Sequence, residues 1–203
     1  MAEFFLFKSP LAHEALLTVV QEQAASLGYT LLLDQSPPPE VSTFLSRQRG
    51  PIHGFDVRGL YGPGDWTLWK NVGAALQCPW LAFILQLKAF WELLAYRGLE
   101  EVDLFSPLPE AWEEDEAYEA TWRGHPATVA ALWGEPLSKI ERYFQSWVAI
   151  GQTPDAFGPR TIAYLTDQYS YGEMWQVLDV MKAFGAPDLL APSARLHTFQ
   201  TKA

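Results

Sequence analysis

The single cysteine of the chain, Cys78, has neighbours that would suit nucleophilic chemistry. Pro79 follows it, and the apolar residues beyond Pro79 recur at helical spacing, which predicts a helix that begins here. Because backbone N–H groups and the dipole at a helix N-terminus stabilise a thiolate, Cys78 would be reactive at that position. No recognisable nucleophile motif surrounds it, however, so a buried and unreactive cysteine is the preferred interpretation.

A second group of chemically capable residues lies on a strand predicted over residues 53–61. Asp56 and Arg58 are two residues apart, so they share a face of the strand and can form an ion pair or bind a small anion. His53 and Asp56 lie on opposite faces, which excludes a simple dyad. A structural ion pair between Asp56 and Arg58 is the preferred interpretation.

A third candidate is the polar, aromatic segment 164–172, which precedes a helix predicted from the capping pair Ser170 and Glu173. Its residues can line a ligand pocket. Alternatively, the side chain of Asp167 or Ser170 bonds backbone amides and fixes the segment, and this is the preferred interpretation. A pocket hypothesis places the site between the sheet and the helical half and combines Asp56, Arg58, Cys78, Asp167 and Tyr169.

Common cofactor and metal motifs are absent from the sequence. Gly59, Gly62 and Gly64 are not followed by the lysine of a phosphate-binding loop, and Asp65 would repel phosphate. The remaining histidines, His13, His125 and His197, lie far apart and show no metal-ligand spacing. We therefore predict no cofactor and no metal, and the sequence favours a binding protein over an enzyme.

The most distinctive charge pattern is an acidic run over residues 100–119, which holds nine acidic residues and no lysine or arginine. Such a run suits a docking surface for a basic partner protein, with nearby aromatic side chains as anchors. A merely solvated linker is the alternative, because runs of like charge are often only exposed. The docking hypothesis names Glu110, Trp112, Glu113, Glu114, Asp115, Glu116, Tyr118, Glu119 and Trp122.

Composition narrows the classes of function. The net charge of −10 repels phosphate backbones, so we expect no direct nucleic-acid partner. The most apolar stretch, residues 80–96, is interrupted by polar and charged residues and is too short to span a bilayer, so we expect no membrane partner. One cysteine and the lack of a signal-peptide pattern predict a cytoplasmic protein. Nothing in the sequence specifies an oligomeric state.

The elements that must position these residues are strands and helices in the first half of the chain. Residues 3–8 and 29–34 are predicted strands, with a helix between them that ends at Gly28. Residues 36–50 are predicted as a loop or lid with a short helix. Residues 53–61 and 66–72 suit a β-hairpin, residues 79–97 a central apolar helix, and residues 102–105 a last strand.

The second half is predicted to be mainly helical, with helices that begin near Pro126, Pro136 and Ser170. The predicted fold is α+β: an N-terminal mixed sheet with a β-hairpin packed on a long apolar helix, then a mainly helical C-terminal half. The regions are the sheet-and-helix region 1–106, an acidic connecting segment 107–124, a helical region 125–185 packed on the first, and a tail or docked arm 186–203. One compact domain can also contain all four. An acidic, aromatic-rich protein of this kind suits an immunity-like or inhibitor-like binding module, with a small-molecule binder or enzyme as the alternative.

Overall fold

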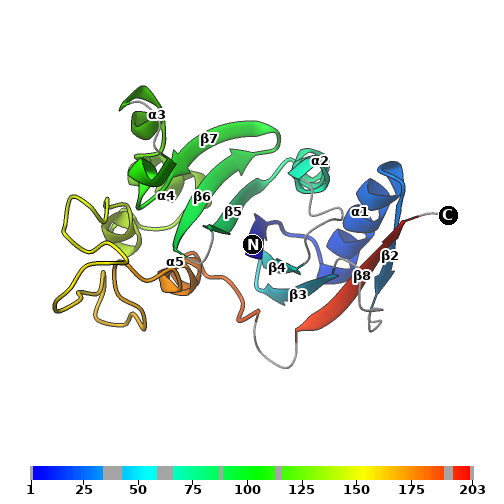
Figure 1. Ribbon diagram of the computed structural model, residues 1–203. Helices are drawn as coiled ribbons and strands as arrows, with labels where there is room; N and C mark the ends of the chain where they lie inside the picture. Colours follow the sequence, from blue (N-terminus) through cyan, green and yellow to red (C-terminus); the bar gives the residue numbers. More distant parts are fainter. Residues whose placement is uncertain are drawn as a thin grey trace.

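An eight-stranded antiparallel sheet forms the centre of the computed structural model, in the order β2-β8-β3-β4-β1-β5-β6-β7 (Figure 1). The structure describes residues 2–33, 43–58, 66–86, 89–112, 116–189 and 194–201. The strands are β1 Ala2–Lys8, β2 Tyr29–Leu33, β3 Thr43–Arg49, β4 Ile52–Arg58, β5 Pro79–Gln86, β6 Phe90–Arg97, β7 Glu100–Phe105 and β8 Arg195–Thr201.

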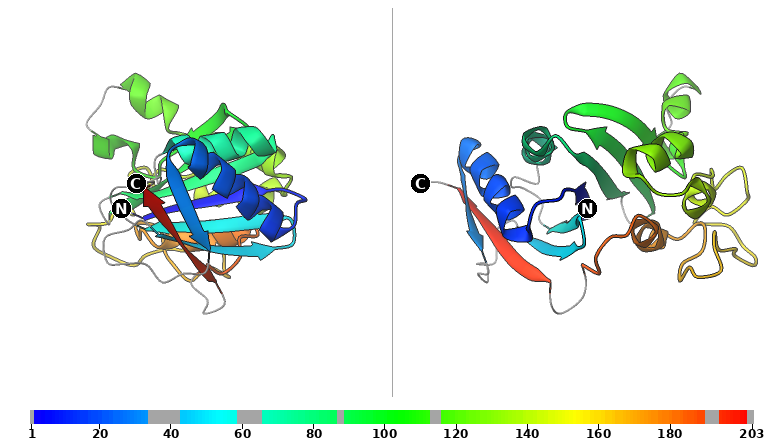
Figure 2. Two further views of the ribbon diagram at one scale, coloured as in Figure 1. Left: turned by 90° about the vertical axis from the view of Figure 1, so that its right-hand side faces the viewer. Right: turned by 180° about the vertical axis from the view of Figure 1, so that it is seen from behind.

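Helices cover both faces of this sheet (Figure 2). On one face, α1 (His13–Ser26) and α2 (Trp66–Leu76) pack over a cluster that contains Trp69 and Trp80. On the other face, α4 (Pro126–Trp133) and α5 (Gln176–Ala183) pack over a second cluster. Strands β1, β5 and β6 are therefore buried on both sides, and they consist of nearly continuous apolar residues.

The predicted central helix over residues 79–97 is wrong, because these residues form the antiparallel strands β5 and β6. Leu81 and Phe83 face one cluster, whereas Trp80 and Ala82 face the other. A strand buried on both faces loses its alternation of polar and apolar residues, so its sequence cannot be distinguished from a buried helix by period alone.

The predicted hairpin of residues 53–61 and 66–72 is also wrong. Strand β4 pairs with β1 and β3, and residues 66–76 form the helix α2. The buried residues Leu68, Trp69 and Val72 lie on one side of that helix. The Gly-Pro-Gly-Asp segment on which the hairpin prediction depended lies outside the described residues.

The C-terminal segment, predicted as a tail or docked arm, contributes residues 195–201 to the sheet as β8. Strand β8 pairs with β2 along Tyr29–Leu33 and with β3 along residues 43–46. Residues 43–49, expected within a loop, form β3. The rest of the predicted lid, residues 36–42, lies outside the described residues.

Several local predictions are confirmed, together with the mixed α+β class. Strands β1, β2 and β7, helix α1 and the start of α4 at Pro126 agree with the sequence patterns. The acidic segment contains η1 (Pro109–Trp112) and α3 (Glu116–Thr121), and two 3-10 turns follow α4: η2 (Leu137–Lys139) and η3 (Glu141–Tyr143). In the described part of the chain, no helix has the length and hydropathy to cross a bilayer.

Candidate functional site

Cys78 is a buried residue at the beginning of β5. Its side chain belongs to the cluster beneath α1 and α2, and only 6% of it is exposed. Burial raises the pKa of the thiol to about 11, since a thiolate would lose its hydration. Pro79 opens a strand, so the predicted helix terminus that would have activated Cys78 does not exist.

Asp56 lies on the opposite face of the sheet from Cys78. It sits across from Phe4 on β1 and Leu45 on β3, and only 1% of it is exposed. Phe4 belongs to the cluster beneath α4 and α5, and paired residues of antiparallel strands share a face. The structure therefore does not bring Asp56 and Cys78 together. The side chain of Arg58 lies outside the described residues.

The segment around Asp167 is fixed by hydrogen bonds to carboxylates. The Asp167 carboxylate accepts the Tyr143 hydroxyl at 2.7 Å and the Tyr164 backbone N–H at 2.9 Å. On α5, Asp179 accepts the backbone N–H groups of Gln168 and Tyr169 at 2.9 and 2.8 Å. The preferred expectation, that Asp167 bonds a backbone amide, is confirmed.

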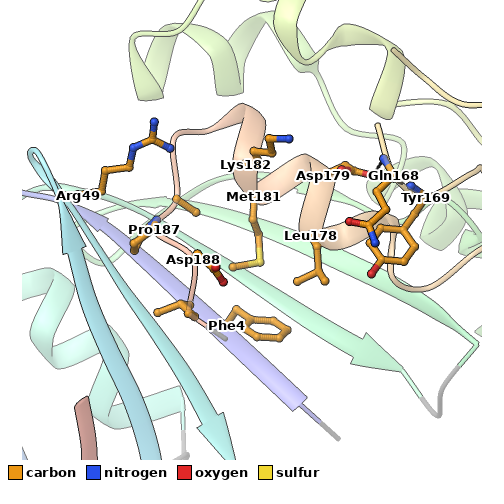
Figure 3. A pocket seen from close by; sticks show the side chains of 12 residues that line it. Phe4, Arg49, Gln168, Tyr169, Leu178, Asp179, Met181, Lys182, Pro187 and Asp188 are labelled. Carbon is orange, nitrogen blue, oxygen red and sulfur yellow. Dashed lines mark hydrogen bonds between the residues drawn. The ribbon is translucent and has the colours of Figure 1, made fainter. Parts of the chain in front are cut away.

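A pocket of about 450 Å³ does lie between the sheet and α5 (Figure 3). Phe4, Leu178 and Met181 form its apolar part, and Arg49 and Tyr169 lie at opposite ends. Of the predicted pocket residues, Tyr169 lines this pocket. Asp167 instead lines a separate hollow of about 300 Å³, together with other residues that include Tyr143 and Tyr164.

The acidic segment presents its side chains outward from the body of the protein. Helix α3 buries none of its residues, and Glu110, Glu116 and Tyr118 are exposed. Trp122 packs partly against the core, 6.3 Å from the Tyr118 ring, so it holds the end of α3 in place. Glu113, Glu114 and Asp115 and the side chain of Trp112 lie outside the described residues.

A hollow of about 320 Å³ lies between η1 and α3. Glu110 and Glu119 line it, with the rings of Phe105 and Phe144 as its apolar wall. Arg123 also lines it and offsets part of the negative charge. Two residues of the docking hypothesis, nine positions apart in sequence, thus face one concave surface.

Exposed apolar side chains gather in the irregular chain between α4 and α5. Phe157 and Leu165 are almost fully exposed, and Val148 and Ile162 are partly so. None of them is among the site residues predicted from the sequence. This segment is a second surface that a partner could contact, although it carries no charge pattern that would specify one.

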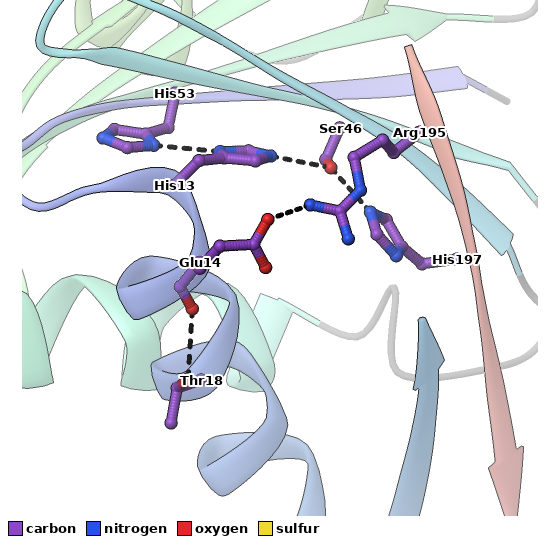
Figure 4. Close-up of polar contacts among 7 residues, drawn as sticks. All are labelled: His13, Glu14, Thr18, Ser46, His53, Arg195 and His197. Atoms are coloured by element: carbon purple, nitrogen blue, oxygen red, sulfur yellow. Dashed lines mark hydrogen bonds and ion pairs between the residues drawn. The ribbon is translucent and has the colours of Figure 1, made fainter. Parts of the chain in front are cut away.

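A histidine and serine network, absent from the sequence predictions, lies between α1 and the sheet (Figure 4). His13 Nδ1 is 3.2 Å from His53 Nδ1, and His13 Nε2 is 3.0 Å from Ser46 Oγ. Ser46 Oγ is in turn 2.6 Å from His197 Nε2. We call these four residues the histidine network.

One fixed acceptor sets the direction of every proton in the histidine network when its histidines are neutral. The Ser9 carbonyl can only accept, so His53 Nε2, at 3.3 Å, carries the hydrogen and His53 Nδ1 accepts from His13 Nδ1. His13 Nε2 then accepts from the Ser46 hydroxyl, and Ser46 Oγ accepts from His197 Nε2–H. These tautomers follow from the hydrogen-bond pattern.

A serine beside a histidine suggests nucleophilic chemistry, but access rules it out here. Only 1% of Ser46 is exposed, so no substrate carbonyl can approach its hydroxyl. Burial lowers the pKa of His13 to about 4 and the pKa of His53 in the same direction, so both are neutral near pH 7. Among the described residues, no group of three or more His, Cys, Asp or Glu side chains can hold a metal ion.

No protein-family model, curated protein or solved structure matches this chain.

Proposed function

We propose that the protein is a binding module whose acidic recognition surface docks a basic partner protein, in the manner of an inhibitor or immunity protein. The acidic surface consists of Glu110, Glu116, Tyr118 and Glu119 in the described part of the chain. The observation that carries the proposal is that α3 forms a helix yet buries none of its residues. Forming a helix costs conformational entropy, and α3 recovers little of it by packing.

Charge specifies the chemistry of the partner. Residues 100–119 hold nine of the acidic residues of the chain and no lysine or arginine. The ion pairs found between described residues, Lys139–Glu135, Arg195–Glu14 and His125–Asp103, involve no member of the acidic surface. Lysine and arginine side chains of a partner would therefore meet negative charge that this chain leaves largely unneutralised.

The shape of the acidic surface suits the same partner. The hollow between Glu110 and Glu119 can take one long basic side chain, with its methylene stem against Phe144 and its charge beside the carboxylates. Tyr118, exposed on α3, offers an aromatic face to a second cation.

The test is binding of a fluorescently labelled peptide rich in lysine and arginine, measured by anisotropy. The variant Glu110→Gln, Glu116→Gln, Glu119→Gln should bind about tenfold more weakly, a loss of about 1.4 kcal/mol. The control Glu22→Gln, Glu141→Gln, Asp155→Asn removes the same charge from exposed positions elsewhere and should bind nearly as tightly as wild type. Equal losses in both variants, or none, would overturn the proposal.

A small-molecule binder is the second candidate, and the pocket beside α5 favours it. Phe4 and Met181 supply an apolar surface, and Arg49 can pair with a carboxylate at one end. Aromatic carboxylates are the probes to test by thermal shift against wild type and Met181→Trp, which fills the pocket. Stabilisation of wild type and not of Met181→Trp would support this function, and stabilisation of neither would reject it.

A further inference from the structure

The histidine network joins four elements that are distant in the sequence. His13 is the first residue of α1, Ser46 lies on β3, His53 on β4 and His197 on β8. Beside it, Arg195 of β8 pairs with Glu14 of α1. Within the described residues, β8 pairs with β3 over residues 195–198, and these side chains add to its attachment on that side.

An added proton does not fit the neutral arrangement of the histidine network. If His53 gains a proton at Nδ1, two N–H groups face each other across 3.2 Å. If His13 gains it at Nε2, the Ser46 hydroxyl loses its acceptor. The Ser46 hydroxyl keeps a partner only if it turns to His197 Nε2, which then carries its hydrogen at Nδ1. An added proton therefore either breaks a hydrogen bond or reverses the donors of the network as far as His197, and in each case a charge is buried.

The charged groups around the network do little to compensate. In the described residues, α1 contributes the carboxylate of Glu14, which already pairs with Arg195. From β8, Arg195 opposes a positive charge on His13. Strand β4 contributes His53, β3 contributes the neutral Ser46, and the chain before α1 contributes the Ser9 carbonyl.

We propose that the histidine network is an acid-sensitive clasp that holds β8 and α1 on the sheet at neutral pH and loosens β8 when it gains a proton. The sign follows from burial. In the unfolded or locally opened chain a histidine has a pKa of about 6.5, whereas the pKa of His13 in the folded protein is about 4. The attachment is complete above pH 6.5 and weakens as the pH falls toward 4.

Hydrogen exchange tests the clasp on the full chain. Between about pH 7.5 and about pH 5, after correction for intrinsic rates, amides of β8 should lose at least about tenfold in protection, because one pKa unit is tenfold in an equilibrium constant. Amides of β5 and β6 should lose much less. His13→Gln, which keeps a polar amide but cannot titrate, should reduce the loss in β8.

Two further variants keep the test decisive. His125→Gln removes an exposed histidine that bonds Asp103, and it should leave the acid sensitivity of β8 unchanged. Ser46→Ala breaks the network without removing a titratable group, so it should weaken protection of β8 at both pH values. The clasp is rejected if β8 keeps its protection at low pH, or if it loses the same protection in wild type and in His13→Gln.

Discussion

Strand β5 buries nearly every side chain, whereas helix α3 buries none. Trp80 of β5 stacks on Tyr96 at 4.2 Å and donates its indole N–H to the Gly98 carbonyl at 2.8 Å. Tyr118 of α3 is exposed, and its ring lies 6.3 Å from that of its neighbour Trp122. The comparison indicates that stability is concentrated in the sheet, and that α3 can change without loss of the fold.

The largest expected effect is at Trp80. Trp80→Ala should lower the free energy of unfolding by about 3–5 kcal/mol, because it leaves a cavity between Phe7 and Tyr96. Denaturant titration measures this. The matched control is Trp175→Ala, at a tryptophan that is 42% exposed, and it should cost less than about 1 kcal/mol. Similar losses at both positions would contradict a sheet-centred core.

A smaller loss of stability is expected for a substitution at Gly73, where α2 approaches β5. A Cβ at this position would lie 2.2 Å from Trp80 Nε1, so Gly73→Ala should destabilise the protein by about 1–3 kcal/mol. In an unhindered helix the same change would stabilise by about 1 kcal/mol, so even the sign of the effect tests the packing. Ala75→Ser, at an exposed residue of α2, is the control for thermal unfolding.

Acid should weaken the α1 side of the sheet before the strands at its centre. As the pH falls from 6.5 toward 4, the unfolded chain gains protons that His13 in the folded protein does not, so the free energy of unfolding falls. Urea titrations of wild type and His13→Gln across this range measure the difference. Parallel curves for the two proteins would show that His13 does not contribute.

The smallest effect on stability is expected on the acidic surface. Tyr118→Ala should change the free energy of unfolding by no more than about 0.5 kcal/mol, since the side chain is exposed. The same variant should bind the basic peptide more weakly, because the peptide loses an aromatic contact. A large loss of stability with unchanged binding would reverse the roles assigned to the two regions.

The parts of the fold that could be predicted from sequence are those whose signals are local. Strand β1 and helix α1 were found from short apolar patterns and from Gly28, whose φ of 86° ends the helix region. Strands β5 and β6 were missed because burial on both faces removes the alternation that identifies a strand. Strand β8 was missed because its partners, β2 and β3, are far away in sequence.

The same contrast between local and long-range signals applies to the candidate sites. The exposure of Glu110, Glu116 and Tyr118 agrees with a run of like charge, which is itself a local signal. The histidine network could not be found in this way, because its four residues lie on α1, β3, β4 and β8 and meet only in the assembled sheet. The described residues of the predicted pocket do not all come together, for a similar reason: Asp56 and Cys78 lie on opposite faces, a relation set by strand pairing.

The most direct test of the proposed acidic recognition surface is a map of where the basic peptide binds. Backbone amide chemical shifts of the isotope-labelled protein would be recorded as the peptide is added at low salt. The proposal predicts shifts concentrated in η1 and α3, at Glu110, Glu116, Tyr118 and Glu119, that disappear as salt is raised. Shifts concentrated instead around the pocket at Tyr169 and Met181, or around the exposed Phe157 and Leu165, would contradict it.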